Sequence, residues 1–379
     1  MSEDESAIPL ATRALRFIVE QIRSMRAAGN LTHPYEDIPS QSFWRSGVVE
    51  TDRQIWPEIY VPKVRITRDT AVATAGSCFA QHIGNYLNLS GVNVLDAEPR
   101  PKGMSAELAR QYGFGLYSAR YGNVYTARQM RELLEDAIAG QVYTRLFLTR
   151  DDRWFDALRP GVEPEGCESR EEAIELRREH LMKVVSLAQM ADVFVFTLGL
   201  TEGWIHTGVN RTMAMAPGVI AGSYRKRHAF HNFTYDEIIA DLAEILRLLR
   251  MLNKNIRLLL TVSPVPLTAT ASGQHVLAAT TYSKSVLRAA AGDFATAQEG
   301  VDYFPSYELV TAWANTTPAF AANLRSVRPE TVERVMAVFL TAQGLLEPVE
   351  AAEDESMSDA EEVEEDVVCE EALLEALRK

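Results

Sequence analysis

The first candidate for chemistry is a serine at the end of a short apolar run. Residues 70–77 (TAVATAGS) are largely apolar, and residues 78–91 continue with a helical period that ends in a glycine. This pattern predicts a strand, a tight turn and a helix. A hydroxyl at such a turn lies beside backbone N–H groups that can stabilise an oxyanion, and the helix dipole favours negative charge there. Ser77 is therefore a candidate nucleophile, although a serine in this position often only caps the helix.

A serine hydroxyl needs a base to become a nucleophile, and the sequence has seven histidines. His275 is the first candidate, because it follows an apolar run at 255–263 and is expected at the carboxyl edge of a sheet. His206 and His82 are the alternatives, although His82 should point away from the serine on the same helix. Cys78 is a second candidate nucleophile, since thiolates are favoured at helix starts. A small buried side chain is the more common role of a free cysteine.

A basic and aromatic segment at residues 223–233 (SYRKRHAFHNF) is a candidate lid or substrate contact. Phe230 in this segment and Trp204 before it offer flat faces of the kind that stack on sugar rings. His228 and His231 have a spacing that a metal ion tolerates, but no third ligand accompanies them. No glycine-rich phosphate loop is present either. We therefore expect no metal and no cofactor.

The elements that must position these residues follow from the apolar periodicity. Strands are expected over residues 70–77, 93–96, 192–199, 255–263 and 301–304, and helices over residues 10–28, 78–91, 173–190, 235–252, 283–297 and 328–342. This alternation is typical of α/β proteins with a central, mostly parallel sheet between two layers of helices, a three-layer sandwich. Sites in such folds lie just after the strands, which here means after Ala75, Gly199 and Ser263.

Several ordered blocks of sequence make the chain recognisable. The residues Gly76–Ala80 (GSCFA) and Thr197–Trp204 (TLGLTEGW) resemble conserved blocks of the GSCFA family. Four further blocks match in the same order: Tyr121–Thr126, Ser263–Thr268, Tyr282–Arg288 and Tyr303–Glu308. The resemblance covers roughly residues 45–345, and ordered blocks are far more specific than one motif.

The resemblance implies an SGNH hydrolase-like fold, because GSCFA proteins are placed among the SGNH/GDSL-like hydrolases. Those enzymes hydrolyse or transfer acyl esters, often on carbohydrates, through a Ser-His-Asp arrangement. Ser77 matches the nucleophile of the first block, with Gly76 in place of the usual aspartate. The matching positions of the second and third blocks are expected to bind the oxyanion and substrate: Gly122, Asn123, Gly199, Thr201 and Trp204. Glu202 is expected to orient a histidine or act as an acid.

The fourth block departs from the superfamily pattern. Superfamily members carry Asp-x-x-His after the last strand to supply the base, whereas residues 320–329 (FAANLRSVRP) contain no histidine. The leading interpretation is an esterase or O-acyltransferase acting on a glycan or glycolipid precursor, with Ser77, His275 and Glu202 as catalytic residues. The alternative is a catalytically silent module that binds a carbohydrate or a protein.

Charge and composition exclude other classes of protein. The net charge is −14, and the segment from Glu347 to the end holds 14 acidic and only 2 basic residues. The rest is nearly neutral, which argues against nucleic acid as a partner. We expect an N-terminal helix and arm over 1–44, one domain over 45–346, and a disordered acidic tail over 347–379 that is a possible docking segment for a protein partner. The three cysteines are widely separated and the N-terminus is acidic, so we expect a cytoplasmic protein. The sequence contains no long apolar run, so we expect no transmembrane segment.

Overall fold

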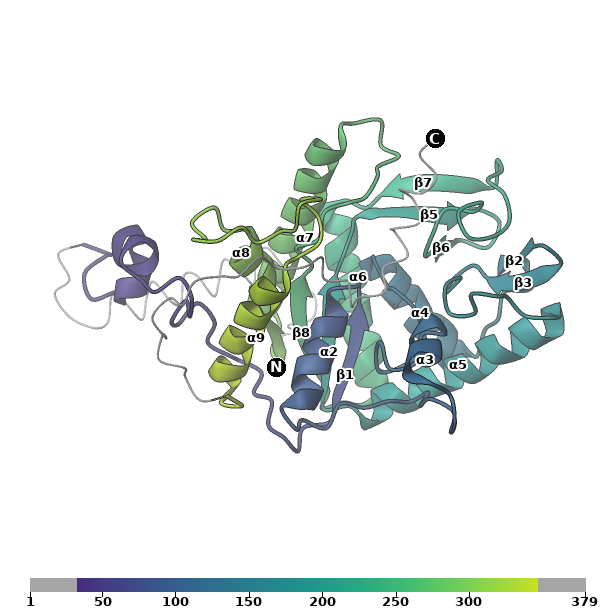
Figure 1. Ribbon diagram of the computed structural model, residues 1–379, viewed down its shortest axis with the longest axis horizontal. Helices are drawn as coiled ribbons and strands as arrows, with labels where there is room; N and C mark the ends of the chain where they lie inside the picture. The colour runs from purple at the N-terminus through teal and green to yellow at the C-terminus, as the bar shows by residue number, and fades with distance from the viewer. Residues whose placement is uncertain (1–32, 347–379) are drawn as a thin grey trace, which may run out of the picture.

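A four-stranded sheet forms the centre of the computed structural model, in which residues 33–346 are described (Figure 1). Its strand order is β1–β4–β8–β9, and all three neighbouring pairs are parallel. The strands are β1 (Val72–Gly76), β4 (Val193–Leu198), β8 (Arg257–Val262) and β9 (Val301–Tyr303). β4 is buried along its whole length, because helices cover both faces of a parallel sheet.

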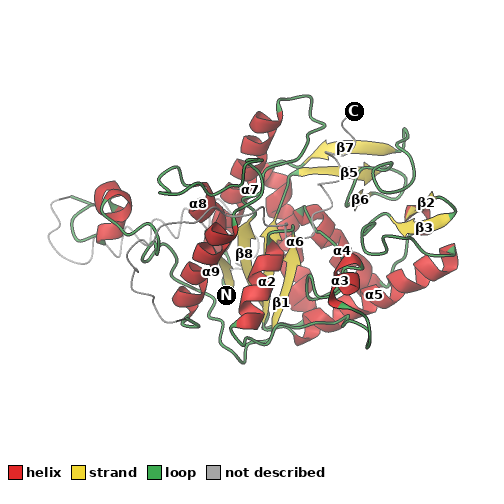
Figure 2. Ribbon diagram, in the orientation of Figure 1, coloured by secondary structure: helices red, strands yellow, loops and turns green. Residues whose placement is uncertain are grey.

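Alternating side chains of these strands form two separate cores. Ala73 and Phe194 belong to the core beneath α4 (Ala127–Ala139), α5 (Arg170–Met190), α6 (Tyr235–Leu252) and α7 (Val276–Ala297). Val72 and Val195 point to the opposite core, beneath α2 (Ala80–Leu89), α8 (Ser306–Thr311) and α9 (Pro329–Gln343). Successive residues of a strand face opposite sides, so each strand supplies both cores. The result is the expected three-layer α/β sandwich (Figure 2).

Smaller elements lie around this sandwich. β5 (Glu202–His206) starts just after β4 and forms an antiparallel sheet with β6 (Arg211–Met213) and β7 (His228–Asn232). A hairpin joins β2 (Phe147–Arg150) to β3 (Arg153–Asp156), and α3 (Ala106–Gln111) is a short helix. Short helical turns occupy Ser40–Ser42, Arg45–Val49 and Thr144–Leu146. Figure 1 shows the segment around the first two of these turns, in purple, projecting from the side of the molecule.

Most predicted elements of the described region are confirmed, with two differences. Residues 93–96 do not form a strand, since only a single bridge joins Val94 to Val72. α7 begins seven residues before its predicted start, which makes His275 a helix cap and not a loop residue. The predicted helix over 10–28 and the acidic tail lie outside the described residues, and the domain boundaries stay predictions. None of the helices in the described part of the chain has the length and apolar character that a membrane span requires.

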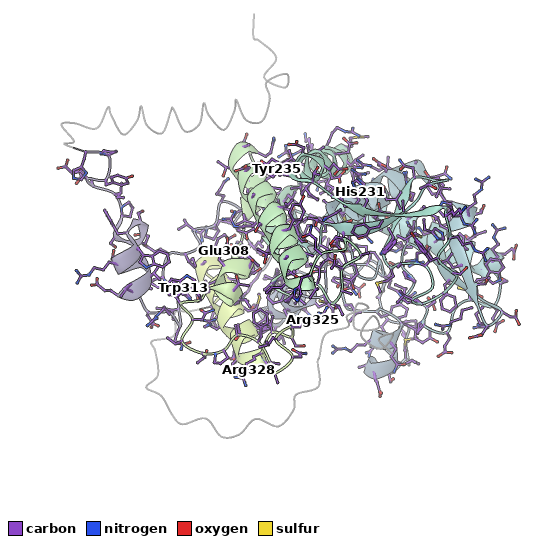
Figure 3. The ribbon with its side chains drawn as sticks, turned by 90° about the horizontal axis from the view of Figure 1, so that it is seen from above. His231, Tyr235, Glu308, Trp313, Arg325 and Arg328 are labelled. Atoms are coloured by element: carbon purple, nitrogen blue, oxygen red, sulfur yellow. The ribbon has the colours of Figure 1, made fainter. Side chains whose placement is uncertain are left out.

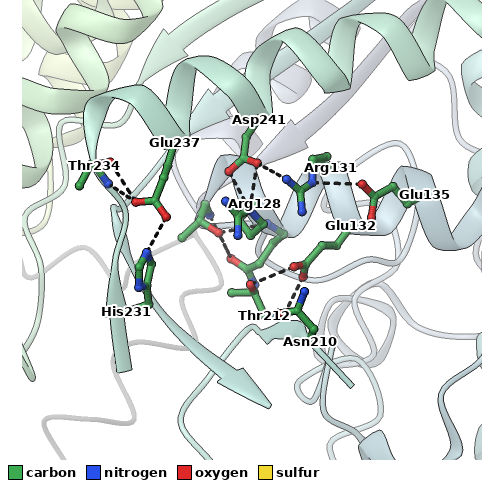
Figure 4. A network of polar contacts seen from close by, with 12 residues as sticks. Arg128, Arg131, Glu132, Glu135, Asn210, Thr212, His231, Thr234, Glu237 and Asp241 are labelled. Carbon is green, nitrogen blue, oxygen red and sulfur yellow. Dashed lines mark hydrogen bonds and ion pairs between the residues drawn. The ribbon is translucent and has the colours of Figure 1, made fainter. Parts of the chain in front are cut away.

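A buried network of charges joins α4 to α6 and to the β5–β7 sheet (Figure 4). Asp241 of α6 is fully buried and accepts hydrogen bonds from Arg128 at 2.9 Å and from Arg131 at 2.7 Å, both on α4. Glu132, also on α4, accepts a hydrogen bond from the backbone N–H of Thr212 at 2.6 Å. The Asp241 contacts attach α6 to α4, and the Glu132–Thr212 contact attaches the β5–β7 sheet to α4.

Replacing Glu132 by glutamine is expected to stabilise the protein at alkaline pH. Burial raises the pKa of Glu132 from 4.5 to about 7, so the folded state binds the proton more tightly than the unfolded state does. Stability is therefore lost as the pH rises from about 4.5 to 7 and stays low above that range. The variant should gain up to about 3 kcal/mol at pH 8 and little at pH 4. Urea unfolding at the two pH values measures this difference, and an equal gain at both would contradict the assignment.

Candidate active site

Ser77 lies directly after β1, where the strand turns toward α2. Gly76 has a φ of +141°, and a Cβ atom there would come within 2.4 Å of the backbone oxygen of Thr197. Only glycine fits this close approach of two backbones. The backbone N–H of Ser77 then donates to the same Thr197 oxygen at 3.1 Å. The serine is thereby fixed against the end of β4, and its side chain is buried.

The Ser77 hydroxyl has no structural task in the described part of the chain. Its Oγ atom is buried and has no hydrogen-bond partner there. The N-cap of α2 is Phe79, and no side chain caps that helix. The interpretation of Ser77 as a capping residue is therefore wrong. A buried hydroxyl without a partner is costly, and such groups in folded proteins often have a functional role.

Residues 121–126 cross the ends of β1 and β4 beside this serine. Val124 donates its backbone N–H to the oxygen of Gly76 at 2.9 Å, and the Tyr125 oxygen accepts the N–H of Gly199 at 3.0 Å. Asn123 is buried between them and accepts a hydrogen bond from the Tyr117 hydroxyl at 2.6 Å. Gly122 and Asn123 of the second block therefore belong to a segment that is hydrogen-bonded to both Gly76 of the first block and Gly199 of the third.

Gly199 touches Ser77 from the end of β4. A Cβ atom on Gly199 would lie 2.9 Å from the Ser77 Cβ and 3.0 Å from the Tyr125 oxygen, so a side chain would not fit. The Gly199 oxygen accepts a hydrogen bond from Lys284 Nζ at 2.7 Å. Lys284 belongs to α7 and is only 1% exposed. A single residue therefore separates this buried amine from the serine.

Sequence reasoning did not identify Lys284 as a site residue. It belongs to the block Tyr282–Arg288, which was noted only for its family resemblance. A lysine in a helix is usually exposed, and only the packing of α7 at the sheet edge buries this one. The neighbouring Ser283 accepts the backbone N–H of Thr201 at 3.0 Å, so α7 is attached to the site at two successive residues.

Some of the groups expected to bind an oxyanion already make hydrogen bonds to other parts of the protein. Ser77 and Gly199 both donate their N–H groups to backbone oxygens. The Thr201 hydroxyl donates to Asn232 at 2.6 Å and so positions β7 beside β5. In this state of the chain, neither the two N–H groups nor the Thr201 hydroxyl is directed at Ser77. The oxyanion roles expected of Gly122 and Asn123 stay predictions.

The candidate bases do not bind Ser77 in this structure. His275 is exposed, and its Nδ1 accepts the backbone N–H of Leu277 at 3.2 Å as the N-cap of α7. It precedes Lys284 by nine residues, or about 13 Å along the helix. His82 packs against the Phe79 ring, and His206 lies at the far end of β5. The assignment of His275 as the base stays a prediction.

Glu202 and Trp204 lie on the same face of β5. The Glu202 carboxylate accepts hydrogen bonds from Thr270 Oγ1 at 2.5 Å and the backbone N–H of Ala271 at 3.4 Å. Burial raises its pKa. The carboxylate thus holds the loop that precedes α7 and has no bond to His275. The Trp204 ring packs edge-on against Phe230 on β7, at 5.6 Å between ring centres.

The region where the superfamily carries Asp-x-x-His forms a closed turn. Asn323 accepts the backbone N–H groups of Arg325 and Ser326 at 3.0 and 2.9 Å and donates to the Ser326 hydroxyl at 2.8 Å. This turn precedes α9, and Figure 3 marks Arg325 and Arg328 within the segment. Asparagine and serine stabilise the turn, but they cannot replace an imidazole as a base.

Fold and site together define a three-layer α/β protein with a serine at the carboxyl edge of its parallel sheet whose hydroxyl has no hydrogen-bond partner among residues 33–346. The sequence matches the GSCFA family over residues 71–339. The chain belongs to the GSCFA family. No protein of curated function matches the chain. A crystal structure of a protein assigned as a GDSL-like lipase, from Parabacteroides merdae, is similar at 13% identity with a TM-score of 0.33, covering 75% of this chain and 100% of that one. Similarity at this level supports no conclusion about function.

Proposed function

We propose that the protein is an SGNH-type serine hydrolase or acyltransferase that acts on an O-acyl ester, with Ser77 as the nucleophile. The observation that carries the proposal is the buried Ser77 hydroxyl, which has no partner in the described region and does not cap α2. It lies at the carboxyl edge of a parallel sheet, where α/β proteins place their active sites. Its oxygen would attack the ester carbonyl, the bond from that carbonyl to the alcohol oxygen would break, and the alcohol would leave with the proton lost by the serine, giving an acyl-enzyme.

The proposed substrate is a glycan or glycolipid precursor bearing the ester. Trp204 and Phe230 support this choice, because they present aromatic rings on the sheet that begins three residues after Gly199. Aromatic faces are a common platform for sugar rings. Water or a sugar hydroxyl would accept the acyl group, so hydrolysis and transfer use the same residues.

We assign Lys284 the task of holding Gly199 against Ser77 and of placing a positive charge beside it. A nearby cation favours the alkoxide form of the serine. Labelling with a fluorophosphonate probe tests this role. The Lys284→Met variant should label at least about 100-fold more slowly if Lys284 activates the serine, and His275→Ala should do so if His275 is the base.

Circular dichroism on both variants checks that they are folded. If His275→Ala loses labelling while folded and Lys284→Met keeps it, the roles are reversed and His275 is the base.

A second candidate function is carbohydrate or protein binding without catalysis. Two observations favour it. In the described region no histidine is bound to Ser77 Oγ, and the backbone N–H groups of Ser77 and Gly199 donate to backbone oxygens. A folded wild-type protein that resists the probe, while binding immobilised glycans, would establish this alternative.

A further inference from the structure

Two buried imidazoles face each other at the far end of the β5–β7 sheet, away from Ser77. His206 and His228 are directly opposite one another in the antiparallel register, with ring centres 5.5 Å apart. Each residue is only 4% exposed. Both ring nitrogens of His206 and the Nε2 atom of His228 lack a hydrogen-bond partner in the described region. Three such atoms in one place need an explanation, because buried polar groups are nearly always paired.

The hydrogen bonds define what these rings can offer. His228 Nδ1 accepts the backbone N–H of Arg225 at 3.1 Å, so its own proton is on Nε2. Burial lowers the pKa of both imidazoles, which favours the neutral form with one N–H donor on each ring. The pair therefore presents the unused Nε2–H donor of His228 and one N–H donor of His206, whose ring also lies close to its own backbone oxygen.

The charged side chains that act on the two histidines are all positive. Arg227 lowers the pKa of both rings, Arg145 acts on His206 and Arg225 acts on His228. All three arginines are exposed, and Arg225 donates a hydrogen bond from Nε to the Ser223 hydroxyl at 3.1 Å. No carboxylate is among the groups that shift either histidine. Unused N–H donors in a positive field are suited to an anion.

A metal ion fits this place less well. His228 could bind a cation through Nε2 only by losing the proton that the bond from Arg225 keeps there. The arginines would repel a cation, and the described residues contain no group of three potential ligands. His231 lies on the other side of β7, bonded to Glu237 at 2.8 Å (Figure 4), so it cannot complete a site with His228.

An exposed aromatic side chain lies beside His228. The Tyr224 ring lies 6.1 Å from that of His228 and 5.4 Å from that of Trp204, measured between ring centres. Tyr224 is 59% exposed, so its ring is accessible to a ligand from solvent. An aromatic ring beside an anion site provides a platform for a sugar attached to that anion.

We propose that His206 and His228, with Arg145, Arg225 and Arg227, form a binding site for a phosphate group, either free or carried by a sugar phosphate. The two imidazole N–H groups donate to the phosphate oxygens, and the arginines neutralise its charge. This site is separate from Ser77 and does not depend on the proposed hydrolase activity.

The test is a titration of the full-length protein, with its histidines labelled with 15N, with inorganic phosphate at pH 7. We expect phosphate to shift the resonances of His206 and His228 and to raise their pKa, because a nearby anion favours the imidazolium form. His206→Gln and His228→Gln should weaken phosphate binding at least about tenfold. Arg227→Gln, an exposed change that leaves the core intact, should weaken it as well.

Two control variants separate the possible outcomes. His231→Gln removes an imidazole from the other face of the same strand, and Ser77→Ala removes the proposed nucleophile; both should bind phosphate as the wild type does. Unmoved His206 and His228 resonances, or equal binding by Arg227→Gln and the wild type, would overturn the proposal. A shift caused by Zn²⁺ but not by phosphate would overturn it too.

Glucose 1-phosphate identifies the source of the anion. If it binds more tightly than inorganic phosphate and Tyr224→Ala removes that advantage, the site holds a sugar phosphate. Equal affinities that Tyr224→Ala does not change would support the site and assign it to free phosphate.

Discussion

The Ser77→Ala variant is expected to lose fluorophosphonate labelling and to turn over test esters at least about 10³-fold more slowly than the wild type. The reason is that the nucleophilic oxygen is removed and no other hydroxyl takes its place after β1. Removal should not harm the fold, because the Ser77 Oγ atom makes no hydrogen bond in the described region. The free energy of unfolding should stay equal or rise by about 1 kcal/mol, since a buried unpaired hydroxyl is lost.

The matched control is Cys78→Ala, which changes the adjacent buried side chain. This variant should keep its labelling. Mass spectrometry of the labelled wild type should place the probe on Ser77. Probe attached to Cys78, or labelling that persists in Ser77→Ala, would contradict the assignment of the nucleophile.

The second large effect is expected on stability. Asp241→Ala should lower the free energy of unfolding by about 4 kcal/mol, because it removes the carboxylate bound to Arg128 and one of the two carboxylates bound to Arg131. Asp241 is fully buried and bonded to both Arg128 and Arg131 (Figure 4). Urea unfolding of the variant and the wild type measures the difference.

Glu244→Ala is the control, one turn further along α6. Glu244 pairs with Arg247 on the protein surface, where the side chain of Glu244 is 32% exposed and that of Arg247 is 55% exposed. Such pairs contribute little, so this variant should unfold with the wild type. A similar small effect of Asp241→Ala would show that the α4–α6 contact is held by apolar packing alone.

The main strands and helices could be predicted because their patterns are local. The apolar run of β4 and the helical period of α6 are visible in the sequence, and both elements lie where they were expected. The β5–β7 sheet could not be predicted, because its strands are short and rich in polar residues. Their pairing depends on contacts such as Thr201 with Asn232, which are 31 residues apart.

The candidate site divides in the same way. Ser77 could be predicted because a strand, a glycine and a helix follow one another along the chain. The residues around it could not, since α7 begins earlier than its weak pattern of alanines and threonines indicates. That earlier start makes His275 an exposed cap, and the packing of the same helix at the edge of the sheet brings Lys284 to Gly199.

The sequence alone determined the α/β class, the family and the position of the serine, because each depends on residues close together in the chain. The tertiary structure alone decided which groups surround that serine and which histidines meet. Lys284 is 85 residues from Gly199, and His206 meets His228 only through the register of two strands. No local pattern specifies such distances, because they arise when packed layers bring distant segments together.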